Sequence, residues 1–531
     1  SVHAQGATVI SGRVANESGV PVPFVTISIE GTQIGGQSGV DGRYSITIPA
    51  GRRGSAQVTA RLVGFKMSQQ TVTLAGGAMT LNWAMTPVAT ELSGVIITAL
   101  SVQREKQTIG TSQQAVSGED LTKVAAPNLI SAISGKVSGV AISQSGNMGG
   151  SSRIVIRGAN SILGENQPLF IVDGIPIFNS GFSTASAGGG RDYGTAISDL
   201  NADDIASLTV LKGPNAAALY GAQASRGAIV ITTRSGKGAA PGTQFAFTSR
   251  MSIDQLSIFP KYQNKYGQGF GGEFQYVDGA GSGVNDGADE SWGPRLDGQL
   301  IDQFSGKQQP WIAHPNNVRD YFRDGSTISN SISVVTAARG MGARLSLTKD
   351  QITSVVPNSS LGKITASASA SMAVGSKLNL SGSMQYVRDD GLNRTENGYT
   401  EGNPWMSFTW FGRQVDVSSS APTSLKNRFY NTGSTYGFAD GSLYNWNDNY
   451  HRNPYWQQTD NAAPDSRDRV TAQISANYAF TPWLSGLLRA GGDSYRQTTE
   501  EQFAAGNIDR ASASFNGGFN VANRRAKETN L

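Results

Sequence analysis

KITASASASMAVGSKLNLSGSMQYVR, residues 363–388, alternates apolar and polar side chains on both sides of a Gly-Ser turn. A period of two around a tight turn predicts two paired strands with one apolar face and one face of Ser, Thr, Asn and Gln. The apolar face consists of Ile364, Ala366, Ala368, Ala370, Met372, Leu378, Leu380, Gly382, Met384 and Tyr386. Strands that cross hydrocarbon must pair all their backbone groups and close into a barrel with the apolar side outward. The stretch therefore predicts a membrane-spanning hairpin, and a soluble β-sandwich is the alternative.

A second hairpin of the same kind follows further along the chain. Residues 470–480 and 484–490 alternate in the same way around a tight Thr-Pro-Trp turn at 481–483. Long polar segments rich in aromatic residues, 256–325 and 391–465, lie between the predicted hairpins. Short turns that alternate with such long loops are typical of outer-membrane barrels and unusual in compact soluble domains.

The number of strands predicts an incomplete barrel. The region after residue 237 provides roughly 8 to 12 strands, whereas a barrel wide enough to enclose a separate plug needs about 22. We therefore expect residues 238–531 to be a partial transmembrane β-barrel with long extracellular loops. The chain is expected to be the N-terminal part of a longer protein.

Composition excludes several classes of protein. The chain has 531 residues, 38% hydrophobic content and 65 glycines, which favours several domains built mainly from strands and turns. Its formal net charge of +4 comes from scattered Lys and Arg, so nucleic acid is not an expected partner. The absence of cysteine excludes disulfides and thiolate metal sites. No apolar run reaches about 18 residues, so any membrane crossing must use strands.

The first 110 residues divide into three parts. Residues 1–5 have small or permissive residues where signal peptidase cleaves and are expected to be a signal-peptide remnant, with an arbitrary flexible start as the alternative. Residues 6–86 contain short alternating runs between turn signals such as ESGVP and SGVDG, which predicts a small antiparallel β-sandwich. Residues 87–110 are expected to be a polar linker around one β-prone stretch, ELSGVIIT at 91–98.

Residues 111–237 mix helical and strand patterns and predict a small α+β domain. A helical spacing of apolar residues connects Leu129, Ile130, Ile133 and Val137. The piece NAAALYG predicts a second helix, with Asn215 as a candidate cap and Gly221 as its end. The runs RIVIRG, PLFIVDGIPI and GAIVITTRSG supply the predicted strands.

Several of these stretches resemble a known family. LFIVDGIPI at 169–177 and ISDLNADDIASLTVLKGPNAAALYGAQASRGAIVITTRSGK at 197–237 closely resemble the plug signature of the SusC/RagA family of TonB-dependent outer-membrane transporters. YGQGFGGEF, ESWGPRLDG, RDYFRDGSTISNSISV and WMSFTWFGRQVDV resemble stretches of that family's barrel and loops. The first 86 residues are similar to the carboxypeptidase-regulatory-like domain that precedes many such transporters. The plug-signature positions are Arg153, Arg157, Gly158, Asp173, Gly174, Asp204, Lys212, Tyr220, Gly221 and Gly227.

The resemblance implies a mainly β protein: a carboxypeptidase-regulatory-like β-sandwich, an α+β plug, and the first part of an antiparallel barrel of about 22 strands. It implies TonB-dependent import of a bulky nutrient, an oligosaccharide or a peptide, across the outer membrane. The implied partners are TonB of the TonB-ExbB-ExbD complex, a SusD-like surface lipoprotein, outer-membrane lipid and the glycan or peptide ligand. The N-terminal domain and the plug are then expected to be accessible from the periplasm.

The stretch at 91–98 matches the place and texture of a TonB box. The candidate coupling residues are Glu91, Leu92, Val95, Ile96, Ile97 and Thr98. An extended β-branched peptide on a tether can add as a strand to the sheet edge of a partner. The family often has an acidic pair where Ser93-Gly94 stand, and an ordinary strand of the plug or sandwich is the alternative.

Charged residues of the plug region offer a candidate polar network. Arg153, Arg157, Asp173 and the pair Asp203-Asp204 are placed to hold a plug inside a charged lumen, and polar contacts suit a plug that must move. The simpler interpretation is that they are solvated strand ends, with Asp203 or Asp204 capping a turn.

The long loops contain two candidate ligand features. Trp405, Trp410, Tyr455 and Trp456 are candidates for stacking on sugar rings, with anchoring at the membrane interface as the alternative. The acidic stretch from Asp286 to Glu290 lacks the spacing of a calcium loop, so we expect a solvated loop and no metal.

Catalysis is not expected, and neither is a cofactor. The three histidines have no second zinc ligand within three or four residues, and GxSxG and Walker sequences are absent. Two other functions remain open: an outer-membrane signalling receptor, and a non-transporting glycan-binding β-sandwich module.

Overall fold

The computed structural model divides the chain into two compact units, separated within the linker near residue 97. It describes residues 7–16, 19–32, 34–62, 65, 67–86, 95–97, 103–105, 113–122, 129–159, 161–162, 166–177, 182–213, 215–273, 288–303, 308–422, 424–427, 429–430, 443–447, 450–505 and 517–530.

The first unit is a β-sandwich. One sheet has the order β4-β1-β7, with β8 also paired to β1, and the other has the order β3-β2-β5-β6. The strands are β1 (Thr8–Asn16), β2 (Thr26–Ile29), β3 (Gly35–Gln37), β4 (Arg43–Ile48), β5 (Gly54–Arg61), β6 (Ser68–Leu74), β7 (Gly77–Thr80) and β8 (Trp83–Met85). The prediction of a purely antiparallel sandwich is wrong in one respect, because β1 pairs in parallel with both β7 and β8.

The linker contains a short strand pair, β9 (Val95–Ile97) with β10 (Gln103–Glu105). Three of the candidate coupling residues therefore lie in extended backbone. Glu91, Leu92 and Thr98 lie outside the described residues.

The α+β domain, called the plug below, is built on a five-stranded sheet of order β11-β16-β17-β14-β15 beside the hairpin β12-β13. Its strands are β11 (Gln113–Ser117), β12 (Val140–Gln144), β13 (Ser152–Ile156), β14 (Leu169–Val172), β15 (Ile175–Ile177), β16 (Ile205–Leu211) and β17 (Ala228–Thr233). Its helices are α1 (Gly118–Thr122), α2 (Leu129–Ile133) and α3 (Asn215–Tyr220), with 3-10 turns η3 (Ala196–Asp199), η4 (Ala202–Asp204) and η5 (Ala222–Ala224).

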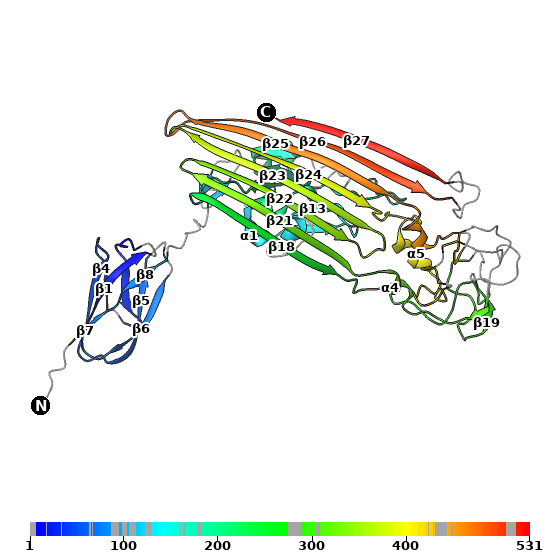
Figure 1. The fold of residues 1–531 in the computed structure, drawn as a ribbon, viewed down its shortest axis with the longest axis horizontal. Coiled ribbons are helices and arrows are strands. Elements are labelled where there is room, and N and C mark those ends of the chain that lie inside the picture. Colours follow the sequence, from blue (N-terminus) through cyan, green and yellow to red (C-terminus); the bar gives the residue numbers. More distant parts are fainter. Residues whose placement is uncertain are drawn as a thin grey trace. The chain divides into compact units, whose positions relative to one another are not determined.

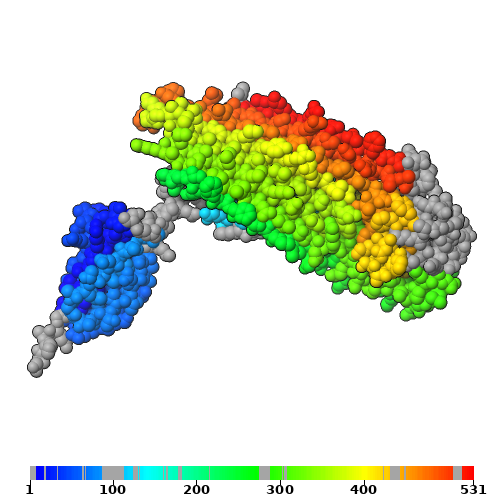
Figure 2. Space-filling model, in the orientation of Figure 1, coloured from blue at the N-terminus to red at the C-terminus, as the bar shows by residue number. Residues whose placement is uncertain are grey.

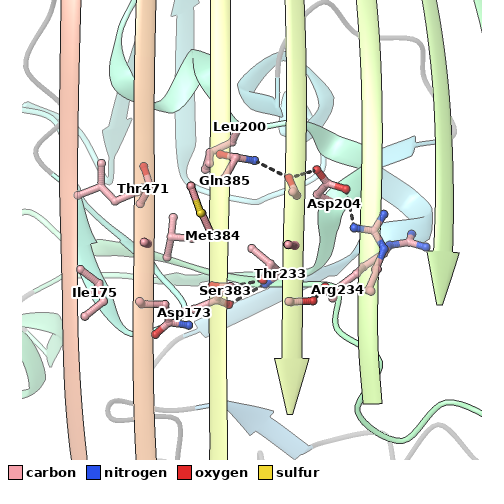
Figure 3. Close-up of a pocket in the computed structure, with 18 residues that line it drawn as sticks. Asp173, Ile175, Leu200, Asp204, Thr233, Arg234, Ser383, Met384, Gln385 and Thr471 are labelled. Carbon is pink, nitrogen blue, oxygen red and sulfur yellow. Dashed lines mark hydrogen bonds and ion pairs between the residues drawn. The ribbon is translucent and has the colours of Figure 1, made fainter. Parts of the chain in front are cut away.

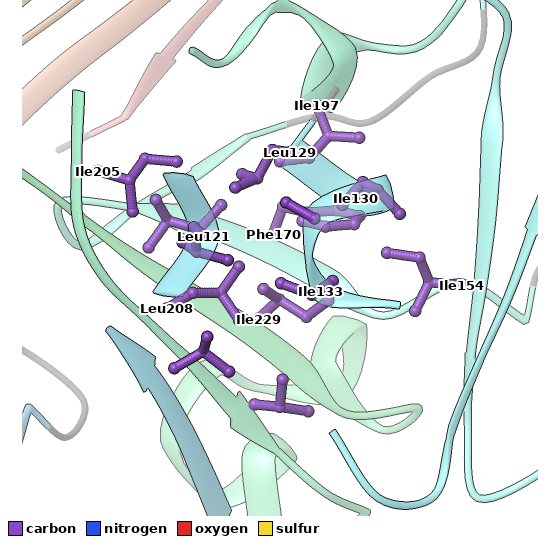
Figure 4. Close-up of a cluster of buried hydrophobic side chains, with 14 of the residues drawn as sticks. Leu121, Leu129, Ile130, Ile133, Ile154, Phe170, Ile197, Ile205, Leu208 and Ile229 are labelled. Atoms are coloured by element: carbon purple, nitrogen blue, oxygen red, sulfur yellow. The ribbon is translucent and has the colours of Figure 1, made fainter. Parts of the chain in front are cut away.

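The apolar core of the plug lies between α1, α2 and the sheet (Figure 4). Leu129, Ile130 and Ile133 of the predicted first helix point into this core and are fully buried. Val137 is buried as well but lies beyond the end of the helix. Gly221 ends the second helix with φ +76°, a left-handed conformation that glycine adopts without strain. The side chain of Asn215 is outside the described set.

The largest element, called the wall below, is an eight-stranded antiparallel sheet of order β18-β21-β22-β23-β24-β25-β26-β27 (Figure 1). Its strands are β18 (Gly242–Asp254), β21 (Gly325–Ala338), β22 (Met341–Thr353), β23 (Ser360–Val374), β24 (Leu378–Leu392), β25 (Pro464–Ala479), β26 (Ser485–Phe503) and β27 (Gly518–Asn530). Both predicted hairpins are present, since Ala368 pairs with Met384 and Ala476 pairs with Leu488. The strands have 13 to 19 residues, longer than the roughly 10 needed to cross hydrocarbon.

The two faces of the wall differ in polarity. A row of register partners on one face is apolar: Val334, Leu345, Ala368, Met384 and Ala472. The next row, on the opposite face, is polar: Ser333, Ser346, Ser367, Gln385, Thr471 and Asp493. The plug lies against the polar face, and Figure 2 looks onto the other face, where strands hide almost all of the plug.

The long loops pack into a separate cluster at one end of the wall, called the loop lobe below. It consists of the described residues of 255–324 and 393–463 and includes β19 (Leu300–Asp302), β20 (Gln308–Pro310), α4 (Asn317–Tyr321), α5 (Pro404–Trp410) and α6 (Pro454–Gln457). Its core is rich in aromatic side chains. Among the described residues, no helix is long and apolar enough to cross a membrane.

Candidate functional site: the interface between plug and wall

An acidic turn of the plug, residues 199–204, faces the wall. The two 3-10 turns η3 and η4 meet here, just before β16. Asn201 caps η4 by accepting a hydrogen bond from the Asp203 amide at 3.0 Å, and its own amide donates to Thr348 Oγ1 of the wall at 2.7 Å. This local geometry presents three carboxylates, Asp199, Asp203 and Asp204, to the strands.

Asp199 pairs with two arginines of β25. Its carboxylate accepts from Arg467 and, at 3.0 Å, from Arg469 Nη1, and all three side chains are almost fully buried. Burial alone raises the pKa of Asp199, but the charges of Arg467, Arg469 and Lys363 outweigh it and hold the pKa below the ordinary value. Asp199 is therefore ionised at neutral pH.

Asp203 and Asp204 pair with the strands on the other side of the wall. Arg250 of β18 binds Asp203 in a bidentate manner, at 2.5 and 2.7 Å. Arg344 of β22 donates to Asp204 at 2.6 Å, and that carboxylate also accepts the Ser346 and Ser367 hydroxyls at 2.7 Å each. Asp204 is only 3% exposed, so it is neither a solvated strand end nor the residue that caps the turn.

The wall supplies carboxylates of its own to some of these arginines. Asp389 of β24 lies 2.5 Å from Arg467, and Asp493 of β26 lies 2.5 Å from Arg469. In the described part of the chain, the ion pairs of Arg344 include no carboxylate of the wall. Arg344 therefore depends on the plug for its counter-charge, whereas Arg467 and Arg469 do not.

The Asp173-Gly174 turn between β14 and β15 makes a third contact with the wall (Figure 3). Asp173 accepts from the Thr233 amide and hydroxyl at 2.8 and 2.6 Å and from Ser383 of the wall at 3.3 Å. Burial raises the pKa of Asp173 despite these bonds. Gly174 has φ +86°, and a Cβ there would lie 1.9 Å from Arg489 Nη1, which donates to the Gly174 carbonyl. Only glycine fits this position without movement of Arg489.

A narrow cavity separates the plug from the wall beside this turn (Figure 3). Its lining includes Asp173, Ile175, Leu200, Asp204, Ser383 and Thr471. The plug thus rests on the wall through hydrogen bonds and ion pairs, together with apolar contacts such as Phe182 of the plug against Tyr495 of the wall.

The remaining signature residues serve the plug internally or lie at its surface. Lys212 is buried and donates to Ser138 Oγ at 3.0 Å and to Gln114 Oε1 at 3.3 Å. Burial raises the pKa of Tyr220. Arg153 is exposed on β13, Arg157 and Gly158 follow that strand, and Gly227 precedes β17.

Most of the described cations at the interface belong to the wall, but the plug contributes the buried Arg191, which pairs with Glu501 of β26 at 3.2 Å and with Glu396 of the loop lobe at 3.1 Å. Among the described residues, Arg153 and Arg157 form no ion pair with the wall, whereas Arg250, Arg344, Arg467 and Arg469 do. These four were not predicted from the sequence. The sequence did contain a sign of them: each is an arginine on the polar face of a strand whose side chains alternate between polar and apolar.

The loop lobe is tied to the plug as well. Arg394 is fully buried, donates to Asp465 at 2.9 Å and to the Met148 carbonyl of the plug at 2.9 Å. Asn147 exchanges two hydrogen bonds with Thr395, at 2.7 and 3.0 Å. The plug and the loop lobe are therefore joined by direct hydrogen bonds.

The aromatic residues of the loops are mostly structural. Trp456 is fully buried and Tyr455 is 6% exposed, so the expectation that these two rings stack on a sugar is wrong: Tyr455 belongs to the core of the loop lobe, and Trp456 donates to the Tyr430 hydroxyl at 2.9 Å. Trp410 is partly buried against the same core. Trp405 is 40% exposed and stacks on Phe322 at 4.5 Å, which leaves it the most accessible of the four.

The acidic stretch of the loops is partly engaged in an ion pair. Asp289 lies 2.7 Å from His451 Nε2, and Asp286 lies outside the described residues. Within the described ranges, no group of three or more His, Asp or Glu side chains is arranged to hold a metal.

Two stretches of the chain match models of known domain families. Residues 105–228 match the TonB-dependent Receptor Plug Domain, and residues 10–97 match the CarboxypepD_reg-like domain. TonB-dependent receptor SusC of Bacteroides thetaiotaomicron is 27% identical over 360 residues, 67% of this chain and 31% of SusC. TonB-dependent receptor P26 of Formosa agariphila is 31% identical over 240 residues, 45% of this chain and 22% of P26.

The fold is also found among solved structures. The RagAB peptide importer in its open-open state superposes with a TM-score of 0.55 at 17% identity, covering 78% of this chain and 44% of the RagAB chain. The chain thus spans less than half the length of each of these relatives.

Proposed function

We propose that this chain, which is a TonB-dependent receptor of the SusC/RagA type, is the N-terminal part of an importer that admits a bulky nutrient when its plug is pulled from the periplasm. The observation that carries the proposal is the interface of plug and wall. A folded domain rests against the polar face of a sheet through buried ion pairs such as Asp204-Arg344. Such contacts can be replaced by water when the plug moves, whereas an apolar core cannot be exposed at so small a cost.

The polarity of the wall supports an outer-membrane location. Large apolar side chains such as Phe245, Leu345, Ile474 and Leu488 are 61 to 75% exposed on the face away from the plug. Exposure on this scale is unfavourable in water and suits lipid. With the short turns toward the periplasm and the loop lobe outside, the N-terminal unit and the plug are accessible from the periplasm.

We assign a separate role to each part of the chain. Residues 6–86 form the N-terminal domain, 87–110 the tether, 111–237 the plug and 238–531 the first part of the barrel. The coupling segment is Glu91 to Thr98, and β9 within it already has the extended conformation that strand addition to TonB requires. A pull on this tether acts on the plug directly.

The partners and cargo follow from the family type. TonB binds the tether from the periplasm, and a SusD-like lipoprotein covers the loop lobe from outside. The cargo belongs to the oligosaccharide or peptide class, and the structurally similar RagAB is itself a peptide importer.

The test is deletion of residues 91–98 from the full-length protein in its parent organism. We expect uptake of one nutrient class, glycan or peptide, to be lost while surface binding of that nutrient is kept, because binding does not need the pull. The matched control is the double variant R52A/R53A in an exposed turn of the N-terminal domain, which should import normally.

Two results would contradict the proposal. Uptake that persists after the deletion would remove the coupling role of 91–98. A transcriptional response to ligand without any uptake would favour a signalling receptor instead.

A further inference from the structure

An outward-facing cluster of basic side chains lies on β26 and β27, on the face of the wall opposite the plug. Arg496 of β26 and Arg525 of β27 are direct register partners, and Lys527 is the partner of Ser494 in the adjacent row. All three basic side chains are exposed. The neighbouring residue Tyr495 contacts Phe182 of the plug at 4.7 Å between ring centroids, so Arg496 points the other way.

Among the described residues, neither arginine of the cluster forms an ion pair. Like charges directly opposite each other on neighbouring strands destabilise a sheet. The nearest carboxylate in the row is Asp468, the register partner of Arg496 on β25, and it is engaged by the Tyr386 hydroxyl at 2.6 Å and by Arg388 at 3.3 Å. Among the described residues, no ion pair joins Arg496, Arg525 or Lys527 to a carboxylate. An anion placed between the two arginines would therefore relieve their repulsion.

The position of the cluster along the strands indicates where that anion lies. Leu488 is 72% exposed near the turn end of β26, and Arg496 follows eight residues later, about 27 Å along the strand. The exposed Phe480 and Trp483 lie in the turn that precedes β26, as expected for one interface of a membrane. The basic cluster lies on the loop side of Leu488 and of the aromatic turn, and on β27 it is followed toward the loops by the exposed Val521 and Phe519 on the same face.

The surface around the cluster is hollowed. A shallow groove is lined by Asp468, Val470, Ser494, Arg496, Arg525 and Lys527. Figure 2 looks onto this face of the wall, where β25, β26 and β27 form the orange-to-red edge. Guanidinium groups bind phosphate oxygens in a bidentate manner, and an ammonium group adds a point charge.

We propose that Arg496, Arg525 and Lys527 form a binding site for the phosphate group of an anionic lipid in the outer leaflet. The acyl chains would lie on the apolar rows toward the turns, and the phosphate would lie between the two arginines. The inference rests on the proposed function only in taking the wall to span the outer membrane.

The test compares two double variants of the full-length protein purified in detergent. R496Q/R525Q removes the pair, and R339Q/K377Q removes the same number of charges from the exposed turns at the other end of the wall. The probe is diphosphorylated lipid A, and native mass spectrometry measures the lipid retained per protein. We expect R496Q/R525Q to retain at least about fivefold less than wild type, the control to stay near wild type, and R496K/R525K, which keeps the charge but not the bidentate geometry, to lie between them.

Three outcomes would overturn the proposal. The first is equal retention by wild type and R496Q/R525Q, and the second is equal binding of lipid A from which the phosphates have been removed. The third is full displacement of lipid A by inorganic phosphate at the concentration that half-saturates a lipid-free sample, because the lipid would then add nothing. Failure of the proposed function would show separately, as loss of the wild-type protein from the outer-membrane fraction or import that survives deletion of 91–98.

Discussion

The two halves of the interface between plug and wall hold the same kind of carboxylate in different ways. Asp199 pairs with Arg467 and Arg469, each of which also has a carboxylate of the wall at 2.5 Å. Asp204 pairs with Arg344, whose other side-chain partner on the wall is the Ser346 hydroxyl. If the plug moves as proposed, Arg467 and Arg469 keep a carboxylate of the wall, whereas Arg344 keeps none among the described residues and must be hydrated instead. Unequal halves favour a plug that releases in order, with the Asp199 side giving way first.

The largest expected effect comes from Asp204→Asn. The change leaves Arg344 buried beside a neutral group, which costs about 3–5 kcal/mol for a buried pair that loses one partner. Hydrogen exchange of the β16 amides, measured on the full-length protein in detergent, should show opening that is easier by that free energy. An unchanged exchange rate would mean that water already compensates Arg344.

Asp199→Asn is expected to have a smaller effect, about 1–3 kcal/mol, since Arg467 and Arg469 keep Asp389 and Asp493. The same exchange measurement on the same amides checks it. If Asp199→Asn equals or exceeds Asp204→Asn, the contrast between the two halves is wrong. If the contrast holds, the double variant D199N/D389N should show the larger cost, because Arg467 then loses both carboxylate partners.

Gly174→Ala tests a contact that contains no ion pair. The new Cβ would meet the Arg489 guanidinium at 1.9 Å in a backbone with φ +86°, and strain of this kind costs about 1–3 kcal/mol. Thermal unfolding of the plug should shift downward. Adding Arg489→Ala to Gly174→Ala removes the clash but not the left-handed backbone, so it should restore only part of the lost thermal stability. Full restoration would show that alanine is not strained in this backbone.

The smallest expected effect is a dependence of stability on pH. It should be present for the ion pair of His451 in the loop lobe and absent over the same pH range for the arginine pairs of the interface. Burial lowers the pKa of His451, but Glu401 and Asp289 outweigh it, so the pKa lies above its ordinary value. A raised pKa in the folded state means that this contribution is fully present below the unfolded pKa and is lost as pH rises through the folded pKa. The loop lobe should therefore loosen toward alkaline pH, as followed by tryptophan fluorescence.

The matched control for this titration is His451→Gln, which should remove the pH dependence of the loop lobe. The contribution of Asp199 to stability depends on pH in the opposite direction. Its lowered pKa makes its contribution present above the unfolded carboxyl pKa, and the contribution is lost only as pH falls through the folded value. Hydrogen exchange of the plug should accordingly stay constant across the range in which the loop lobe responds.

The local sequence pattern was sufficient to predict strands and helices, but not to predict which side chains contact each other between the plug and the wall. The alternation at 363–388 predicted both strands and their apolar face, because a strand with one face in lipid and one toward water must alternate. The spacing of Leu129, Ile130 and Ile133 predicted a helix that the structure contains. Arg344 could not be matched to Asp204 in this way, since the two are 140 residues apart and only the fold brings them together.

The errors also have physical causes. Tyr455 and Trp456 lie in a polar stretch of the sequence, which predicted exposed rings in a loop. In the structure the long loops pack against one another, and both rings are buried. The parallel pairing of β1 with β7 and β8 depends on a crossover connection of about 60 residues, which no local turn signal encodes.

The length of the wall strands has a consequence for the thickness of bilayer that the protein tolerates. The apolar rows on β26 end about eight residues after Leu488, and at a tilt of about 40° that span rises only about 20 Å. β26 continues for a further seven residues, to Phe503, with Thr498, Glu500 and Gln502 on the outer side. The neighbouring strand β27 instead exposes Val521 and Phe519 on this side, so its apolar surface extends further toward the loops. The strands of the wall would therefore match bilayers of different thickness, with β26 suited to a thin one.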